Sequence, residues 1–413
     1  MNYLILLPTV AAFILGAGVL KYDLEDIKKL NSYAVTATVL VALTAAVTLV
    51  SMSGESVTLF SFNDMLKIGF RVDGLSTVFG AMVSFLWPLA VVYATEYMKH
   101  EGKQKKFFTF YIMTFGVTLA IAFSANMLTL YLCYEMLTFI TLPLVMHTTD
   151  ERSAYAGGKY LVYSVGGASL AFVGMMIVLL NGGSLEFTYG GIGTLESNTT
   201  ILFAYLLMFA GFGVKAAIFP LHGWLPGASV APTTVTALLH AVAVVKAGVF
   251  AIMRTTFFFF GADFLRGTWV QNVVMTMAII TICFGSWSAV KSRHLKRRLA
   301  YSTVSQLAYI VFGITLMSVD SFKGSMSHML FHGIVKIVLF YTAGAILYTN
   351  HKEFVDDIEG FAYKMPKTFA LFTISSVSLI GIPPLAGFLS KYTLATAAVK
   401  EMSAGNILPF LGV

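Results

Sequence analysis

Long continuous apolar runs, separated by short polar connections, extend along the whole chain. Each run is long enough to cross roughly 30 Å of hydrocarbon as a helix. A transmembrane barrel would instead need short segments of alternating polarity. The pattern therefore predicts an all-α polytopic membrane protein with about 12 transmembrane helices. The runs cover residues 3–20, 31–52, 73–96, 107–123, 126–147, 158–180, 200–219, 232–253, 270–290, 300–318, 325–348 and 369–389.

Prolines interrupt the seventh and the twelfth run. Pro220 follows Lys215 in VKAAIFPLHGWLPG, and Pro383 and Pro384 precede Lys391 in SLIGIPPLAGFLSKY. Proline removes a backbone donor and clashes with the preceding helical turn. Broken membrane helices persist where the freed backbone lines a cavity or contacts other protein. We therefore predict broken helices 7 and 12, with a lysine before one break and after the other, as an inverted repeat would produce. The residues from 390 to 413 are expected to form a short tail.

The composition supports a membrane protein. The chain is 57% hydrophobic and 11% charged, whereas soluble proteins have about 25% charged residues, and its mean hydropathy is +0.80. The net charge of +7 fits basic connections rather than nucleic-acid binding. Cys133 and Cys283 are far apart in apolar runs, which excludes a cysteine-ligated iron–sulfur cluster and disfavours a disulfide framework. MNYLILLP lacks a basic start and a cleavage signal, so we expect a retained first helix.

Lysine and arginine are distributed unevenly between the connections. The odd-numbered connections hold seventeen of them and the even-numbered ones five, with Arg254 counted among the five. Basic residues accumulate in cytoplasmic loops. We therefore expect a multi-pass protein of the cytoplasmic membrane, with the odd connections inside and the N-terminus outside.

Few charged groups remain once the connections are set aside. Lys215, Lys246, Lys336 and Lys391 lie inside runs or at breaks, and Glu135 is the acidic residue well inside one. Ionisable residues at membrane depth are costly and usually functional. Lys215 is the best partner for Glu135. A static ion pair that fixes helix register and a snorkelling lysine are the structural alternatives.

Three histidines accompany these lysines. His240 and Lys246 are six residues apart on different faces of one helix, so a bridging water would be needed to connect them. His328, His332 and Lys336 follow at i, i+4 and i+8 and lie on one face. Two histidines at this spacing can bind zinc, but no third ligand is evident. A proton path is the better interpretation, and we expect no metal and no cofactor in this chain.

Common catalytic motifs are absent from the sequence. It contains no Walker A sequence, no GxGxxG at a helix start, no nucleophile elbow and no paired catalytic carboxylates. Any redox chemistry that drives transport must therefore come from partner subunits.

Four segments carry a family resemblance. VKAAIFPLHGWLPGASVAPTTVTALLHAVAVVKAGVF resembles the core signature of the antiporter-like subunits of respiratory complex I, Mrp-type cation/proton antiporters and membrane-bound hydrogenases. YEMLTFITLPLV is similar to the family's glutamate-bearing fifth helix, LKRRLAYSTVSQLAYIVFG to its tenth and GIPPLAGFLSKY to its broken twelfth. The similarity extends over most of residues 70–392.

The resemblance implies roles for the buried charges. Glu135 and Lys215 would form the family's switching ion pair, and Lys391 would be the terminal protonatable lysine of a second half-channel. The residues between them would form a central hydrophilic axis: His240, Lys246, His328, His332 and Lys336.

The resemblance also implies inverted five-helix repeats. Residues 1–106 would hold helices 1–3, residues 107–254 the first repeat and residues 270–413 the second. Family members carry more helices than the predicted twelve, so the second repeat is expected to be incomplete.

The function implied is translocation of protons, or of another cation, across the cytoplasmic membrane. The chain would be a subunit of a redox-driven NADH:quinone oxidoreductase of the complex I type, or of a hydrogenase complex. Peripheral partner subunits would then hold iron–sulfur clusters, flavin or a nickel–iron site. The first alternative is a subunit of an Mrp-type sodium/proton antiporter. The second is a structural membrane subunit that does not conduct.

Overall fold

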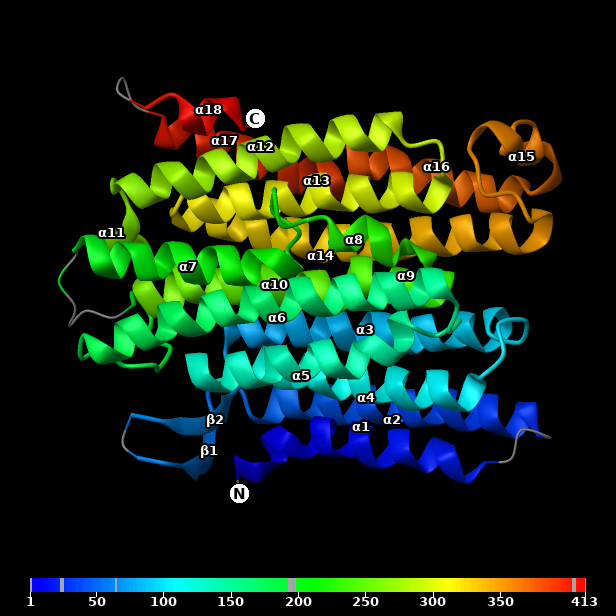
Figure 1. Cartoon of the computed structure of the whole chain (residues 1–413), viewed down its shortest axis with the longest axis horizontal. Helices are drawn as coiled ribbons and strands as arrows, with labels where there is room; N and C mark the ends of the chain where they lie inside the picture. Colours follow the sequence, from blue (N-terminus) through cyan, green and yellow to red (C-terminus); the bar gives the residue numbers. More distant parts are fainter. Residues whose placement is uncertain are drawn as a thin grey trace.

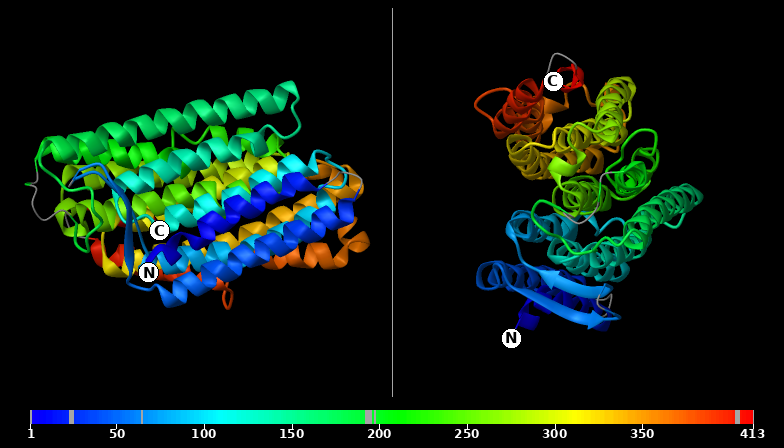
Figure 2. Two further views of the ribbon diagram at one scale, coloured as in Figure 1. Left: turned by 90° about the horizontal axis from the view of Figure 1, so that it is seen from below. Right: turned by 90° about the vertical axis from the view of Figure 1, so that its left-hand side faces the viewer.

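The computed structural model is a stack of helices that run side by side along its long axis (Figure 1). It describes residues 2–22, 26–63, 65–191, 196, 198–402 and 406–412. Viewed end-on, the N-terminal helices form one side of the stack and the C-terminal helices the other (Figure 2). The predicted all-α class is confirmed, with one addition near the N-terminus.

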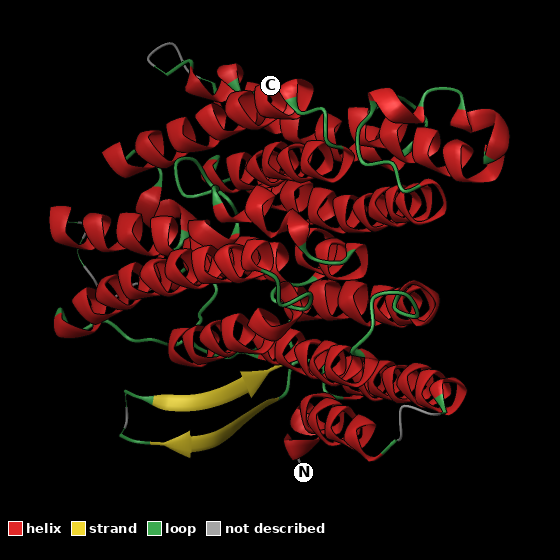
Figure 3. Ribbon diagram, turned by 45° about the vertical axis from the view of Figure 1, so that its right-hand side comes forward, coloured by secondary structure: helices red, strands yellow, loops and turns green. Residues whose placement is uncertain are grey.

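That addition is a two-stranded antiparallel hairpin in the second connection (Figure 3). Its register pairs Ser56 with Arg71. The hairpin was not predicted, because its strands are short and lie within a polar connection. The elements up to residue 97 are a 3-10 turn Asn2–Leu6, α1 Leu7–Gly18, a 3-10 turn Val19–Lys21, α2 Ile27–Ser51, β1 Ser56–Ser61, β2 Lys67–Arg71 and α3 Gly74–Tyr97.

Within the described residues, nine helices are long and apolar enough to cross a membrane. Shorter apolar helices and one helix with a basic first turn accompany them. The helices from residue 104 to residue 350 are α4 Gln104–Phe123, α5 Met127–Val145, α6 Glu151–Leu180, α7 Thr199–Lys215, α8 Trp224–Gly227, α9 Thr233–Ala237, α10 Val244–Met253, α11 Ala262–Leu265, α12 Trp269–Lys291, α13 Leu295–Thr315 and α14 Val319–Asn350. The last ones are α15 Phe361–Lys364, α16 Pro366–Ile380, α17 Ala386–Glu401 and α18 Leu408–Leu411.

Irregular backbone occupies the neighbourhood of both proline sites. α7 ends at Lys215, and helix resumes only at Trp224. α16 ends at Ile380 and α17 begins at Ala386. The chain beyond the second break differs from the expected tail, because it continues as α17. Leu394, Ala397 and Ala398 are buried on one side of that helix, and this apolar spacing accounts for the helix.

The chain between residues 233 and 260 is one buried helical element with two changes of pitch. Two π-helical segments, Leu238–Val242 and Arg254–Phe260, flank α10. Arg254 was assigned to an even-numbered connection, and that assignment is wrong. Its side chain is fully buried, since the helix continues beyond the predicted end of the run and an ion pair compensates the charge.

The odd-numbered and the even-numbered connections lie at opposite ends of the helix stack. The hairpin and α11, in even-numbered connections, lie at the left of Figure 1, whereas α15, in an odd-numbered one, lies at the right. The basic connections therefore gather at the end marked by α15, which we call the basic end.

Candidate proton-transfer site

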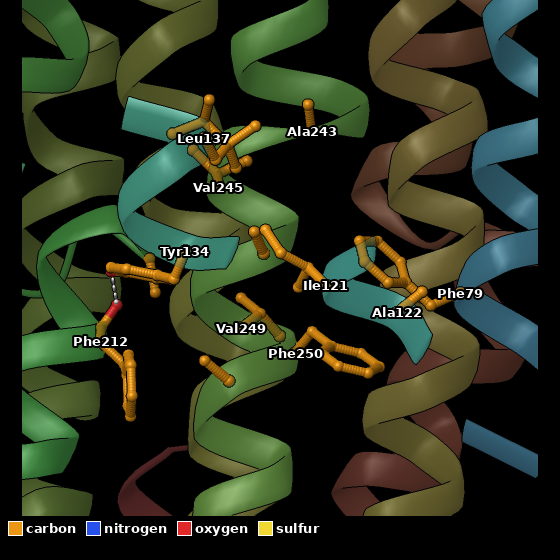
Figure 4. Close-up of a cluster of buried hydrophobic side chains, with 14 of the residues drawn as sticks. Phe79, Ile121, Ala122, Tyr134, Leu137, Phe212, Ala243, Val245, Val249 and Phe250 are labelled. Atoms are coloured by element: carbon orange, nitrogen blue, oxygen red, sulfur yellow. Dashed lines mark hydrogen bonds between the residues drawn. The ribbon is translucent and has the colours of Figure 1, made fainter. Parts of the chain in front are cut away.

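Lys215 is the last residue of α7 and is fully buried. Its Nζ donates a hydrogen bond to the carbonyl oxygen of Tyr134 on α5. The same ammonium lies 3.4 Å from the centre of the Tyr134 ring, a cation–π geometry. The Tyr134 hydroxyl donates to the carbonyl of Phe212 at 3.3 Å, as Figure 4 shows. Tyr134 thus holds the end of α7 against α5 and gives Lys215 its contacts.

Glu135 directly follows this tyrosine but does not contact Lys215. No ion pair of 4.0 Å or less joins their charged atoms among the described residues. Its Oε1 is buried without a hydrogen-bond partner in the part of the chain that is described. Neighbouring Leu132, Met136 and Phe139 are exposed along the outer face of α5. The predicted Glu135–Lys215 pair is therefore open in this structure, and its role stays a prediction.

α10 passes close to Lys215 because residue 248 is glycine. A Cβ on Gly248 would lie 2.5 Å from the nitrogen of Ala216 and 2.8 Å from the carbonyl carbon of Lys215. Real Cβ atoms do not approach backbone atoms so closely. Any side chain here would therefore push the helix that carries Lys246 away from Lys215.

Lys246 lies on α10, two residues before Gly248, and its side chain contacts α14. Its Nζ is 2.6 Å from Nδ1 of His332, and both residues are buried. The ammonium donates to a neutral imidazole, or the imidazole donates to a neutral amine. The contact therefore holds one proton between two bases, at a distance that suits direct transfer. Nε2 of His332 has no partner within the described residues.

His240 does not take part in that contact, as its predicted position on a different face of the helix from Lys246 implied. It is fully buried in the π-helical segment Leu238–Val242. Its ring lies 5.0 Å from that of Phe340, and neither ring nitrogen has a partner among the described residues. Buried polar groups normally have protein or water partners. Single π-helical turns occur frequently at functional sites.

His328 lies one turn before His332 on α14, and their ring centres are 6.3 Å apart. Its Nδ1 is 2.9 Å from the hydroxyl oxygen of Ser390, and its Nε2 is 3.1 Å from Oε1 of Gln306. The Ser390 hydroxyl can itself donate to the carbonyl of Gly387, at 3.2 Å. Both imidazole nitrogens can then donate at once, so the site accommodates protonated as well as neutral His328.

Lys336 and Lys391 lie to either side of these histidines. Lys336 is buried on α14 and donates to the carbonyl of Leu299 at 3.0 Å. Lys391, on α17, is half-buried; it donates to the carbonyl of Ile380 at 3.3 Å and lies 4.8 Å from the centre of the Tyr309 ring. Two cavities of about 400 and 660 Å³ meet at Lys391. This lysine therefore reaches the accessible edge of the buried polar groups.

The structure thus brings four of the eight predicted proton-path residues into one line. Lys246, His332 and His328 form a line from α10 along α14, and Tyr309, with its ring 6.4 Å from that of His328, extends it towards Lys391. His240 is buried without direct contact to this line, and Glu135 is apart from Lys215. No group of three or more metal-ligating residues occurs in the described ranges.

Sequence reasoning missed Gln306 and Ser390, the two partners of His328. Gln306 lies inside an apolar run, at YSTVSQLAYIV, and Ser390 lies just after one, beside Lys391 in GFLSKY. A polar residue on a face that also carries a histidine was the available signal. Neither could be assigned to His328 without the packing of α13 and α17 on α14.

An ion pair between a fully buried arginine and a part-buried aspartate, at the end opposite the basic end, was also missed. Arg254 donates two hydrogen bonds to the carboxylate of Asp73, at 2.6 and 2.8 Å, and one to the hydroxyl of Ser76 at 3.0 Å. Burial alone would raise the pKa of Asp73, but the bonds from Arg254 and Ser76 outweigh it and lower the pKa to about 2. The pair ties the helix of Lys246 to the start of α3.

Two family models match the chain, one over its N-terminal region and one over the remainder. Residues 124–411 match the model described as the transmembrane region of NADH:quinone oxidoreductase/Mrp antiporter subunits. Residues 56–108 match the N-terminal part of chain 5 of NADH–ubiquinone oxidoreductase, complex I.

The chain belongs to the NADH:quinone oxidoreductase/Mrp antiporter family of membrane subunits. It is an antiporter-like, multi-pass membrane protein, as the resemblance predicted.

Named relatives are subunits of sodium/proton antiporters. The chain is 30% identical over 385 residues to Na(+)/H(+) antiporter subunit A1 of Staphylococcus haemolyticus, a match that covers 88% of this chain and 47% of that protein. The same subunit of Staphylococcus aureus is 30% identical over 392 residues, covering 88% and 48%. The chain therefore spans about half the length of these relatives.

Two solved structures share the fold. A chain of the membrane-bound sulfane sulfur reductase, an archaeal respiratory membrane complex, superposes with a TM-score of 0.85 at 23% identity, covering 99% of this chain and 84% of that one. A chain of the Mrp complex from Dietzia sp. superposes with a TM-score of 0.86 at 20% identity, covering 99% and 45%. The family fold is therefore established over nearly the whole chain.

Proposed function

We propose that this chain translocates protons across the membrane as an antiporter-like subunit of a larger complex. The contact between Lys246 and His332 carries the proposal. A proton held between two buried bases can move to either one, and His328 continues the line towards Lys391. A purely structural polar network would need neither two adjacent bases nor a histidine whose partners accommodate both charge states.

Lys215 and Glu135 would control entry to this line. A carboxylate near a lysine stabilises the protonated amine, and its withdrawal favours proton release. In the described structure Lys215 is bonded to a backbone carbonyl rather than paired with Glu135, an arrangement that would favour release. Gly248 lets the helix of Lys246 lie against Lys215, so release at one lysine would occur beside the helix that carries the next.

The driving force comes from elsewhere, and two sources are candidates. The named relatives, at 30% identity, favour a counter-ion gradient and hence sodium/proton antiport. The other candidate is a redox-driven assembly, either a quinone-linked enzyme or a hydrogenase complex, whose peripheral subunits would hold the flavin, iron–sulfur or nickel–iron groups. In both cases the partners would be further membrane subunits. The basic end would face the cytoplasm, with the N-terminus outside.

The deciding experiment uses the intact complex in inverted membrane vesicles. Proton movement would be followed with a pH-sensitive dye in Lys246→Ala, Lys215→Ala and Glu135→Ala variants that assemble normally. Loss of proton movement in all three supports the proposal. Unchanged proton movement would instead make the chain a structural subunit.

The same vesicles distinguish the two driving forces. Proton movement that begins on addition of sodium, without any electron donor, indicates antiport. Movement that needs an electron donor and stops with an inhibitor of electron transfer indicates a redox complex. Copurification of the chain would identify the partner subunits directly.

A further inference from the structure

A cavity of about 490 Å³ lies at the basic end, away from the polar line. Its wall consists of the start of α6, the short helix α8 with the residues on either side of it, and the start of α13. Three basic side chains line it, Arg152, Lys159 and Arg297, together with one acidic residue, Glu151. The proton-transfer site uses none of these four residues. The cavity therefore needs an explanation of its own.

The three basic residues of this cavity outnumber its single acidic one, and Lys159 also lies 5.8 Å from the centre of the Tyr163 ring. In the described part of the chain, none of the three forms an ion pair, and none donates a hydrogen bond to another residue. Lys159 is half-buried, so its charge is partly removed from water. Uncompensated cations that converge on a concave site favour an anion with several acceptor oxygens.

The position of the cavity indicates the kind of anion. Tyr155 and Tyr301 line it beside the basic residues, and tyrosine is enriched where membrane meets water. Further along α6, Val162 is 71% exposed, so the helix presents apolar surface to the hydrocarbon directly next to the cavity. Basic pockets between transmembrane helices on the cytoplasmic side are typical sites for the head groups of anionic lipids.

We propose that this cavity binds the phosphate head group of an anionic phospholipid, whose acyl chains lie along the exposed face of α6. Arg152 on α6 and Arg297 on α13 bind the phosphate from its two sides, and Lys159, further along α6, adds a third positive charge. An acidic protein segment would match the charge equally well, but it would leave the apolar surface beneath the cavity without a partner. The lipid accounts for both features.

The lipid would also touch the segment that follows Lys215. Gly223, Pro226 and Gly227 form part of the cavity wall. Beside them, the indole of Trp224 donates to the carbonyl of Val214, in the last turn of α7, at 2.7 Å. A bound head group would therefore brace the backbone next to the first lysine of the proton path. The binding itself does not depend on the proposed function.

The test compares two triple variants of the purified full-length chain in detergent. Arg152→Gln/Lys159→Gln/Arg297→Gln removes the cavity charges. Lys28→Gln/Lys352→Gln/Lys367→Gln removes three exposed lysines from odd-numbered connections, which neither line the cavity nor form ion pairs in the described structure. The two triple variants therefore lose the same number of positive charges, and both lose them from odd-numbered connections.

Binding of dioleoyl phosphatidylglycerol and of dioleoyl phosphatidylcholine would be counted by native mass spectrometry of the delipidated proteins. We expect the unmodified chain and the control to retain phosphatidylglycerol in preference to phosphatidylcholine. The cavity variant should bind phosphatidylglycerol at least roughly tenfold more weakly, because each basic residue near an anionic lipid contributes to the attraction. An Arg152→Lys/Arg297→Lys variant keeps the charge and should retain most of the binding, which excludes misfolding as the cause.

Three results would overturn the proposal. The first is equal retention of phosphatidylglycerol by the cavity variant and the control. The second is retention of both lipids without preference. The third is displacement of phosphatidylglycerol by inorganic phosphate alone, which would assign the cavity to a free anion. None of these results bears on proton movement in the intact complex, so the outcome is independent of the proposed function.

Discussion

Lys246 on α10 and His332 on α14 are joined by a contact of 2.6 Å between Nζ and Nδ1. The two residues are 86 positions apart in the sequence and both are buried. A lysine and a histidine so close cannot both hold an extra proton at low cost, because like charges repel strongly where water is excluded. Their contact therefore couples the charge state of α10 to that of α14.

Removal of the imidazole should interrupt this coupling. We expect His332→Ala to slow proton movement in vesicles roughly a hundredfold, the scale typical of losing a positioned acid–base group. The control is His351→Asn, which changes an exposed histidine at the end of α14. His351 has a φ of 53°, and asparagine tolerates this region well. Equal rates in the two variants would show that protons do not pass through His332.

The close approach at residue 248 gives a second prediction. Gly248→Ala places a methyl group against the backbone of Lys215 and Ala216, so α10 must shift. Overpacking of this kind costs about 1–3 kcal/mol, and we expect both a lower unfolding temperature and weaker proton movement. Gly158→Ala on α6 is the matched control, because a Cβ there meets nothing within 4 Å. If Gly248→Ala behaves as Gly158→Ala does, the two helices are not in the tight contact described.

The Asp73–Arg254 pair should be important for stability. Asp73→Asn keeps a side chain able to cap α3 but leaves Arg254 buried without a counter-charge. Loss of one member of a buried pair costs about 3–5 kcal/mol. Asp26→Asn is the control, since Asp26 also caps a helix and its pair with Lys29 is exposed; exposed pairs contribute about 1 kcal/mol or less. Comparable unfolding temperatures for the two variants would contradict this account.

The same pair predicts sensitivity to acid. The pKa of Asp73 falls from its ordinary 3.8 to about 2 in the folded chain. A group whose pKa is lowered by folding stabilises the fold above its unfolded value, and this contribution is lost as the pH falls from about 4 towards 2. The free energy of unfolding of the unmodified chain should therefore fall steeply over this pH range. The free energy of unfolding of Asp73→Asn should fall less. A parallel decline in both proteins would mean that other carboxyl groups dominate.

The sequence predicted the helical membrane class correctly, because apolar length alone identifies a candidate span, but its count of about twelve spans stays a prediction beside the nine span-length helices of the described residues. It also identified the lysines and histidines of the polar line, since charges at membrane depth are rare and conspicuous. Arg254 was misplaced because a charged residue at the end of an apolar run resembles a loop residue. Only the partner, Asp73, shows why burial is tolerated, and Asp73 lies far away in the sequence, at the start of α3.

Contacts between helices could not be predicted from spacing. His240 and Lys246 are near neighbours in one helix, yet Lys246 contacts His332 on another. The π-helical segment Leu238–Val242, which contains His240, changes the orientation of His240 relative to Lys246, and hydrophobic periodicity carries no signal for such a segment. α17 was likewise expected to be a tail, because its apolar stripe is short and mixed with polar residues. Its burial depends on the packing surface that α14 provides.

Ser390 provides the last prediction, since it decides how His328 carries a proton. When the Ser390 hydroxyl donates to Gly387, its oxygen can accept from Nδ1 of His328 while Gln306 accepts from Nε2. Ser390→Ala removes one of the two acceptors and leaves a buried donor unpaired whenever His328 is protonated. An unpaired buried donor costs about 1–3 kcal/mol, so proton movement in vesicles should slow by roughly tenfold or more. Thr396→Ala on the same helix is the control, because the hydroxyl of Thr396 bonds only to nearby carbonyls of α17 in the described structure. If both variants conduct at the unmodified rate, His328 does not become protonated during transport and the path must bypass it.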